Sequence, residues 1–170
     1  MTMKLLLSEK KILQRVGTLA RQISKDFSGR ELLMVGVLKG AFVFLADLAR
    51  RMKVPVKIDF VRLASYGSET CSSGKIRFTK DIEVPLKGKD VLIVEDIIDT
   101  GVTLKYLYRC LQARRPRSLT VVTLLDKPSR RKVSFQADYT GFHIPDHFVV
   151  GYGLDCAEEY RNLGGIYIVK

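Results

Sequence analysis

The stretch VLIVEDIIDTGVT, residues 91–103, passes from four apolar residues through a run of carboxylates to a Thr-Gly-Val-Thr group. Its apolar start, Val91–Val94, predicts a strand that is covered on both faces, and the residues that follow predict a helix over Leu104–Ala113. Open α/β sheets bind ligands where a buried strand ends and a helix begins. This junction is therefore the first candidate for a functional site.

The second half of the stretch has the composition of a phosphate-binding turn. Gly101 lets backbone amides approach a ligand closely, Thr100 and Thr103 add hydroxyl donors, and a helix start carries partial positive charge. The first half supplies three carboxylates: Glu95, Asp96 and Asp99. Ribose hydroxyls and a divalent cation are suitable partners for these acids, so a phosphorylated sugar satisfies both halves. The alternative is that the residues only cap the helix and remain solvated.

Strand and helix patterns alternate along the rest of the chain. The predicted helices are Ser8–Phe27, Ala41–Met52 and Leu104–Ala113, and the predicted strands are Leu32–Leu38, Val56–Leu63, Val91–Val94, Ser118–Leu125, Ala137–Phe142, Phe148–Val150 and Ile166–Val169. Between Tyr66 and Lys75 the periodicity disappears into Gly and Ser, which predicts a mobile loop. The alternation favours an α/β fold with a mostly parallel twisted sheet flanked by helices, in a single domain of residues 1–170.

Composition narrows the class of protein. The chain has 170 residues, 46% of them hydrophobic, which is enough for one compact core. It lacks an apolar run of about 18 residues, so we expect no membrane partner. The start, residues 1–11, has neither a long apolar core nor a small-residue cleavage site, which predicts a cytoplasmic protein. The three cysteines form no CxxC pair, which predicts reduced thiols. The net charge of +11 fits either a nucleic-acid surface or a site for a highly phosphorylated small molecule.

The stretch 91–103 resembles the phosphoribosyl-pyrophosphate motif of type I phosphoribosyltransferases, and its exact residues resemble those of the hypoxanthine-guanine branch. Four further blocks are similar to this family in the same order: GVLKGA (36–41), ASYG with its Ser-rich tail (64–74), LLDK (124–127), and FVVGYGLD (148–155) followed by EYRNL (159–163). The resemblance covers the chain from about Leu33 to the C-terminus. It implies the type I phosphoribosyltransferase fold, with a small hood built from the N-terminal and C-terminal segments.

The resemblance implies roles for the pyrophosphate half of the site. Lys39 and Gly40 would bind pyrophosphate, in a loop whose Leu-Lys peptide can adopt the cis form, and Arg161 would reach the same group. Ser65 and Tyr66 would begin the flexible loop that closes over the reaction centre. Asp155 would contact Mg²⁺.

The resemblance also implies roles for the sugar and purine. Glu95 and Asp96 would hold the ribose diol and help to bind Mg²⁺ indirectly, while Asp99 would be the catalytic base near purine N7. Three residues would bind the 5′-phosphate: Thr100, Gly101 and Thr103. The residues implied to bind the purine are Lys127, which would donate to a 6-oxo group, Phe148, which would stack on the ring, and Val149, which would present backbone groups.

The function implied is transfer of the 5-phosphoribosyl group from phosphoribosyl pyrophosphate to hypoxanthine or guanine, with Mg²⁺ as cofactor. It would form IMP or GMP and pyrophosphate in purine salvage, and relatives are commonly homodimers or homotetramers. Two alternatives stay open. One is a regulator of the same fold that binds nucleic acid through the positive surface. The other is an enzyme of the same class that acts on xanthine or a pyrimidine.

Overall fold

The computed structural model describes residues 2–66 and 75–170. Its centre is a six-stranded sheet in the order β4-β3-β2-β5-β6-β7. The strands are β2 (Leu32–Leu38), β3 (Val56–Tyr66), β4 (Lys75–Lys80), β5 (Asp90–Ile98), β6 (Ser118–Asp126) and β7 (Tyr139–His143). Strands β3, β2, β5, β6 and β7 pair in parallel and β4 pairs antiparallel at the edge. The predicted mostly parallel α/β sheet is confirmed.

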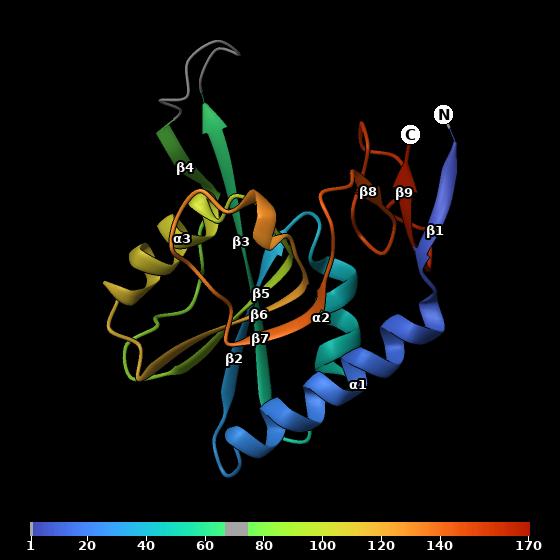
Figure 1. Cartoon of the computed structure of the whole chain (residues 1–170). Helices are drawn as coiled ribbons and strands as arrows, with labels where there is room; N and C mark the ends of the chain where they lie inside the picture. The colour runs from blue at the N-terminus through green and yellow to red at the C-terminus, as the bar shows by residue number, and fades with distance from the viewer. Residues whose placement is uncertain (1, 67–74) are drawn as a thin grey trace.

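Helices cover both faces of this sheet (Figure 1). Helices α1 (Glu9–Asp26) and α2 (Phe42–Ala49) lie on one face and α3 (Val102–Gln112) lies on the other. Helix α1 begins where predicted, because the Ser8 hydroxyl accepts a hydrogen bond from the Lys11 amide at 3.3 Å. Helix α2 is shorter than the predicted range. A single 3₁₀ turn, η1 (Pro128–Arg130), follows β6.

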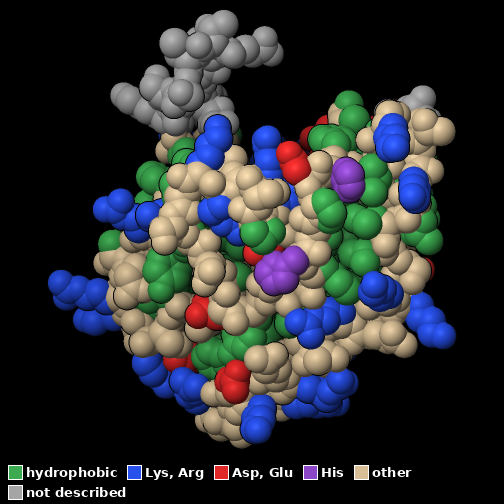
Figure 2. Space-filling view, in the orientation of Figure 1, with side chains coloured by type: hydrophobic (Ala, Val, Ile, Leu, Met, Phe, Trp, Pro, Cys, Tyr) green, Lys and Arg blue, Asp and Glu red, His purple; other side chains and the backbone are tan. Residues whose placement is uncertain are grey.

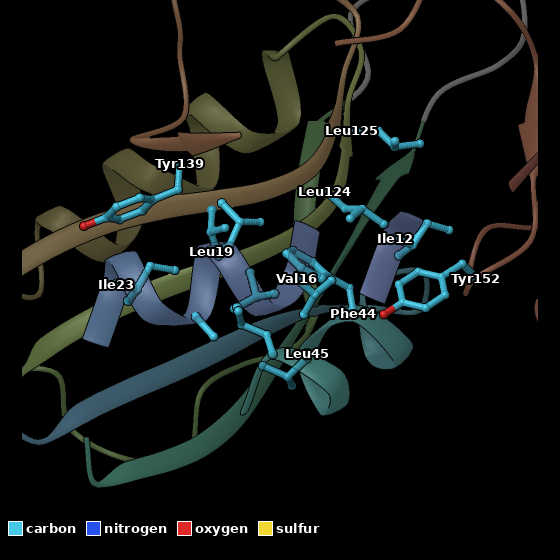
Figure 3. Close-up of a cluster of buried hydrophobic side chains, with 14 of the residues drawn as sticks. Ile12, Val16, Leu19, Ile23, Phe44, Leu45, Leu124, Leu125, Tyr139 and Tyr152 are labelled. Atoms are coloured by element: carbon cyan, nitrogen blue, oxygen red, sulfur yellow. The ribbon is translucent and has the colours of Figure 1, made fainter. Parts of the chain in front are cut away.

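The two faces carry separate hydrophobic clusters. The cluster beneath α1 and α2 packs Leu19 and Phe44 against Leu124 of β6 (Figure 3). The cluster beneath α3 packs Leu107 against Val91 and other residues of β2, β5 and β6. A strand between two such clusters has to be apolar on both sides, which explains the unbroken apolar runs of β2 and β5.

A second sheet of three strands joins the two ends of the chain. It consists of β1 (Met3–Leu7), β9 (Ile166–Val169) and β8 (Val149–Val150), in that order and antiparallel. Figure 1 shows it beside the main sheet, with both termini on it. Strand β1 was not predicted, because its pairing partner lies at the far end of the sequence and the residues MKLLL do not alternate.

Strand β5 is longer than predicted. It pairs with β6 as far as Ile98, opposite Asp126, so Glu95 and Asp96 belong to the strand. The interpretation of Glu95–Ile98 as a loop is wrong. Polar residues suggested that the strand had ended, but the hydrogen-bonded ladder continues through them. The turn that leads to α3 is therefore only Asp99 to Gly101.

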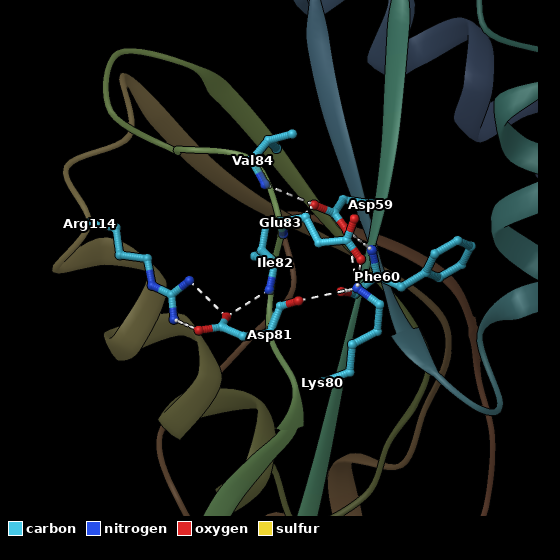
Figure 4. Close-up of polar contacts among 8 residues, drawn as sticks. All are labelled: Asp59, Phe60, Lys80, Asp81, Ile82, Glu83, Val84 and Arg114. Atoms are coloured by element: carbon cyan, nitrogen blue, oxygen red, sulfur yellow. Dashed lines mark hydrogen bonds and ion pairs between the residues drawn. The ribbon is translucent and has the colours of Figure 1, made fainter.

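A polar network fixes the segment that returns from β4 to β5 (Figure 4). The buried Asp59 of β3 accepts hydrogen bonds from the Glu83 amide at 2.7 Å and the Val84 amide at 3.3 Å. Asp81 accepts two hydrogen bonds from Arg114, each 2.8 Å, just beyond the end of α3. Burial alone would raise the pKa of Asp59, but the hydrogen bonds that it accepts from backbone amides lower it. This network holds β3 and the end of α3 together.

Candidate functional site

A polar cavity of about 320 Å³ opens at the carboxyl ends of β2 and β5. Six residues singled out from the sequence line it: Lys39, Gly40, Glu95, Asp96, Asp155 and Arg161. Lys39 and Gly40 directly follow β2, and Glu95 and Asp96 lie near the end of β5. Asp155 and Arg161 come from the segment between β8 and β9. Three separate parts of the chain therefore converge on one cavity, as expected for an open α/β sheet.

The loop after β2 approaches β5 closely. The peptide between Leu38 and Lys39 is cis, the form that the resemblance implies for this loop. At Gly40 the Asp96 carboxylate occupies the space that a Cβ atom would need. The carbonyl oxygen of Gly40 in turn occupies the Cβ position of Gly153, whose φ is +99°. Glycine at both positions is what brings the three segments together.

Ion pairs order the basic side chains of the cavity. Lys39 Nζ lies 2.7 Å from Glu158 Oε2, and this hydrogen bond lowers the pKa of Glu158. Arg161 donates from Nη1 to the Gly153 carbonyl at 2.8 Å and places Nη2 2.9 Å from Asp155 Oδ1. The guanidinium is therefore held on the cavity wall by two fixed acceptors. Such an arrangement can bind an anion without first ordering a flexible side chain.

The two adjacent carboxylates near the end of β5, Glu95 and Asp96, have raised pKa values. Burial raises the pKa of Glu95 well above its ordinary value, and the neighbouring charge of Asp96 adds to this. Burial also raises the pKa of Asp96, although hydrogen bonds and the charge of Arg161 oppose it. A cation or a hydroxyl donor placed between the two would relieve their repulsion. Adjacent carboxylates with raised pKa values in a cavity are typical of binding or catalytic sites.

The turn after β5, which is the predicted phosphate-binding loop, leads directly into α3. Gly101 caps α3 with a φ of +79°, in the left-handed region, and the first turn of α3 contains no acidic residue. The Thr100 hydroxyl accepts a hydrogen bond from the Val102 amide at 3.4 Å, and Thr103 is exposed on the first turn. The backbone amides at the start of α3 therefore have no acidic side chain from the same helix beside them. Together with the partial positive charge of the helix N-terminus, they are suited to bind an anion.

Of the predicted purine residues, Lys127 directly follows β6, Phe148 directly precedes β8, and Val149 is the first residue of β8. Lys127 is 6% exposed and its Nζ lies 3.8 Å from Asp146 Oδ1. The ring of Phe148 is exposed, whereas Val149 is buried in the small sheet. The contact of the Asp99 side chain is with Arg130, whose Nε is 3.1 Å from Asp99 Oδ1.

The carboxylates fit a magnesium ion that is shared with a substrate. Glu95, Asp96 and Asp155 line the same cavity and offer oxygen atoms only. Among the described residues no group of three His, Cys, Asp or Glu side chains is close enough to ligate one ion. Mg²⁺ is commonly held by one or two carboxylates together with substrate phosphates and water. The donor set fits that mode and does not form a closed protein cage.

Sequence reasoning missed several residues of this region. Arg62 and Glu158 line the cavity, while Arg130 and Arg131 contact Asp99. Arg62 is one of many basic residues, and only the register of β3 beside β2 brings it to the cavity. Ser65 and Tyr66 end β3, and residues 67–74 of the predicted mobile loop lie outside the described residues.

Comparisons with known proteins agree with this geometry. The family described as phosphoribosyl transferase domain matches residues 3–157. A curated relative, the hypoxanthine-guanine phosphoribosyltransferase of Bacillus subtilis, is 46% identical over 167 residues, which cover 98% of this chain and 93% of the relative. A crystal structure of a hypoxanthine-guanine phosphoribosyltransferase from Bacillus anthracis has a TM-score of 0.94 and 51% identity, with 98% of each chain covered.

A longer relative shows the same similarity in part of its length. The bifunctional protein TilS/HprT of Listeria innocua is 48% identical over 167 residues, which cover 98% of this chain. This chain spans only 26% of the length of that relative. Across the residues that the structure describes, no helix has both the length and the apolar character of a membrane span.

Proposed function

This chain belongs to the phosphoribosyl transferase domain family, and on that premise we propose that it transfers the 5-phosphoribosyl group of phosphoribosyl pyrophosphate to N9 of hypoxanthine or guanine. The products would be IMP or GMP and pyrophosphate. The observation that carries this proposal is the cavity lined by Lys39, Arg161, Glu95 and Asp96, at the end of the strand that leads into the Gly101 turn. The names of the similar proteins support the same activity.

In the proposed mechanism this chain mainly positions the donor. The amides and hydroxyls from Thr100 to Thr103 would hold the 5′-phosphate, while Glu95 and Asp96 accept hydrogen bonds from the ribose hydroxyls. Lys39 and Arg161 would draw negative charge toward the departing pyrophosphate. Mg²⁺, held near Asp155 and the β5 carboxylates, would supply charge neutralisation of that leaving group.

The purine would lie between Phe148 and Lys127. The buried ammonium of Lys127 donates hydrogen bonds but accepts none, so it favours a 6-oxo group over a 6-amino group. Asp99 would take the proton that leaves the purine as the new bond to N9 forms. Its partial exposure beside Arg130 leaves one carboxylate oxygen available for that transfer.

A panel of bases tests the proposal. The protein is incubated with phosphoribosyl pyrophosphate, Mg²⁺ and one of hypoxanthine, guanine, xanthine, adenine or uracil, and nucleotide formation is followed. We expect turnover with hypoxanthine or guanine and little with adenine. Turnover confined to xanthine or uracil would replace the proposed substrate, and no turnover with any base would contradict the enzyme assignment.

No structural observation favours the alternative of a nucleic-acid regulator. Figure 2 shows Lys and Arg side chains at many separate places on one face of the molecule rather than in one continuous patch. Many basic residues are also paired with acids, including Lys39, Arg131 and Arg161. Salt-sensitive RNA or DNA binding without purine turnover would reinstate this alternative.

We also propose that the chain acts as one domain, with the small sheet as a hood, in a cytoplasmic homodimer or homotetramer. The hood assignment is supported by β8, which carries Val149 and directly follows Phe148. Light scattering of the purified protein measures the oligomeric state, and cell fractionation measures the compartment.

A further inference from the structure

Two segments run side by side behind the proposed phosphate loop. The Lys127 amide donates to the Ile98 carbonyl at 2.9 Å, and the Lys132 amide donates to the Thr100 carbonyl at 3.0 Å. The segment from Asp126 to Lys132 therefore follows the turn at the end of β5. One of these segments carries the proposed 5′-phosphate site and the other carries Lys127.

One side chain joins the two segments between these backbone contacts. Arg131 Nη1 donates to the Asp99 carbonyl at 2.6 Å, and Nη2 donates to the Asp126 carboxylate. The side chains of Arg131 and Asp126 are only 15% and 11% exposed. The second oxygen of Asp126 lies 3.3 Å from Nδ1 of His143, on the edge strand β7. Charge-assisted hydrogen bonds of this kind are stronger and more directional than neutral ones.

The aliphatic part of Arg131 also packs against the loop. A Cβ atom at Gly101 would lie 3.0 Å from Arg131 Cδ and 3.3 Å from Val133 Cγ2. Gly101 caps α3 with a positive φ. Arg131 therefore contacts the Asp99 carbonyl at the start of the turn and packs beside Gly101 at its end. Its position leaves little freedom for the loop to move relative to Asp126.

We infer that Arg131 is a positioning residue that fixes the loop Asp99–Thr103 relative to Lys127. The inference rests on the proposed function, in which these two elements hold opposite ends of one nucleotide. Arg131 acts through the Asp99 carbonyl and through Asp126, the residue directly before Lys127. A shift of about 1 Å between such groups can lower a rate by about a hundredfold.

The variants Arg131→Ala and Arg131→Lys test this inference by calorimetric titration with IMP and, separately, with pyrophosphate and Mg²⁺. We expect Arg131→Ala to weaken IMP binding at least tenfold while pyrophosphate binding stays within twofold, because Lys39 and Arg161 lie in a different part of the site. Arg131→Lys should be intermediate, since an ammonium cannot span both acceptors. Arg21→Ala, which removes an exposed arginine in contact with Thr18, is the control and should change neither constant.

The outcomes separate positioning from general destabilisation. IMP binding within twofold of the wild type in folded Arg131→Ala would overturn the inference, as would an equal loss of IMP and pyrophosphate binding. If Arg131→Ala does not fold, Arg131→Lys decides, and unchanged IMP binding in that variant overturns the inference. A wild-type protein that binds pyrophosphate but not IMP would overturn the proposed function itself, and the inference with it.

Discussion

Arg130 and Asp99 form an ion pair beside the proposed purine site, with Nε 3.1 Å from Oδ1. Both side chains are partly exposed, at 47% and 43%, so solvent screens the pair and it adds little to the stability of the fold. In the proposed mechanism, Asp99 can therefore exchange its contact with Arg130 for a substrate proton at small cost. The neighbouring Arg131 holds the Asp99 backbone instead and is mostly buried.

Arg130→Ala is expected to have a small effect. The free energy of unfolding should change little, because the pair that is lost is exposed. We expect kcat to stay within about fivefold of the wild-type value, because Asp99 itself is retained. Urea denaturation and steady-state kinetics measure the two quantities. A loss of kcat beyond about a hundredfold would show that Arg130 takes part in the reaction and is not a passive partner.

Asp99→Asn should lower kcat much more than it lowers donor affinity. The amide keeps an oxygen that can accept from Arg130, but it cannot take the purine proton. We expect a fall in kcat of roughly a hundredfold or more, the usual contribution of a general base. Donor KM should stay within a few-fold. Turnover comparable to that of the wild type would remove Asp99 from the mechanism.

Lys127→Ala should weaken purine binding and leave donor binding nearly intact. The loss should be about tenfold to a hundredfold in KM for hypoxanthine, corresponding to a charged hydrogen bond of about 1.5–3 kcal/mol. Steady-state assays with each substrate varied in turn measure the effect. Asp146→Ala is the matched control, because it removes the exposed partner of Lys127 without removing the ammonium. An equal collapse of donor affinity in Lys127→Ala would contradict the division of the site into purine and donor halves.

The elements with the clearest sequence pattern are those that the structure confirms. Strands 32–38 and 166–169 have the predicted bounds, because their apolar runs end where pairing ends. Strand β5 shows the limit of this reasoning. Glu95 and Asp96 are polar, yet they remain in the ladder because β6 continues beside them. Pairing with a neighbouring strand, which no local pattern encodes, determined the end of the strand.

Non-local contacts also explain the residues that were missed. Strand β1 exists because Met3 pairs with Val169, at the opposite end of the chain. Arg130 and Arg131 are adjacent, but one reaches the Asp99 carboxylate and the other reaches its backbone. A pair of arginines after a strand gives no indication of that division. It depends on the register between β5 and β6, which brings Asp126 opposite Ile98.

Glu95→Gln should make the ligand-free protein more stable at neutral and higher pH. Burial raises the pKa of Glu95 in the folded state, so the folded protein holds this proton more tightly than the unfolded chain. The stability that the protonated Glu95 contributes to the fold is fully present below its ordinary pKa of 4.5. This stability is lost as the pH rises through the raised pKa of the folded state. The advantage of Glu95→Gln should therefore shrink as the pH is lowered toward 4.5.

Asp47→Asn is the control, because its effect on stability at neutral pH should be opposite in sign to that of Glu95→Gln. Burial by itself raises the pKa of Asp47, but the hydrogen bonds from Tyr152 and Arg50 outweigh it and lower the pKa. This carboxylate stabilises the fold above its ordinary pKa of 3.8, and the stabilisation is lost as the pH falls through the lowered value. Asp47→Asn should therefore destabilise the protein at pH 7. Melting temperatures of both variants across pH give the two signs, and equal signs at pH 7 would contradict the assignment.

Two glycines should respond to alanine in opposite directions. At Gly153 the φ of +99° is unfavourable for alanine, and the Gly40 carbonyl fills the Cβ position, so we expect a loss of about 2 kcal/mol or more in the free energy of unfolding. Gly17 lies inside α1, and its nearest neighbour is Arg21 Nη1 at an ordinary 3.7 Å. Gly17→Ala should therefore stabilise the protein by about 0.5–1 kcal/mol. Urea denaturation measures both, and Gly153→Ala should also weaken pyrophosphate binding because it displaces Gly40. A Gly153→Ala variant as stable as the wild type would show that the close approach of the two loops is not required.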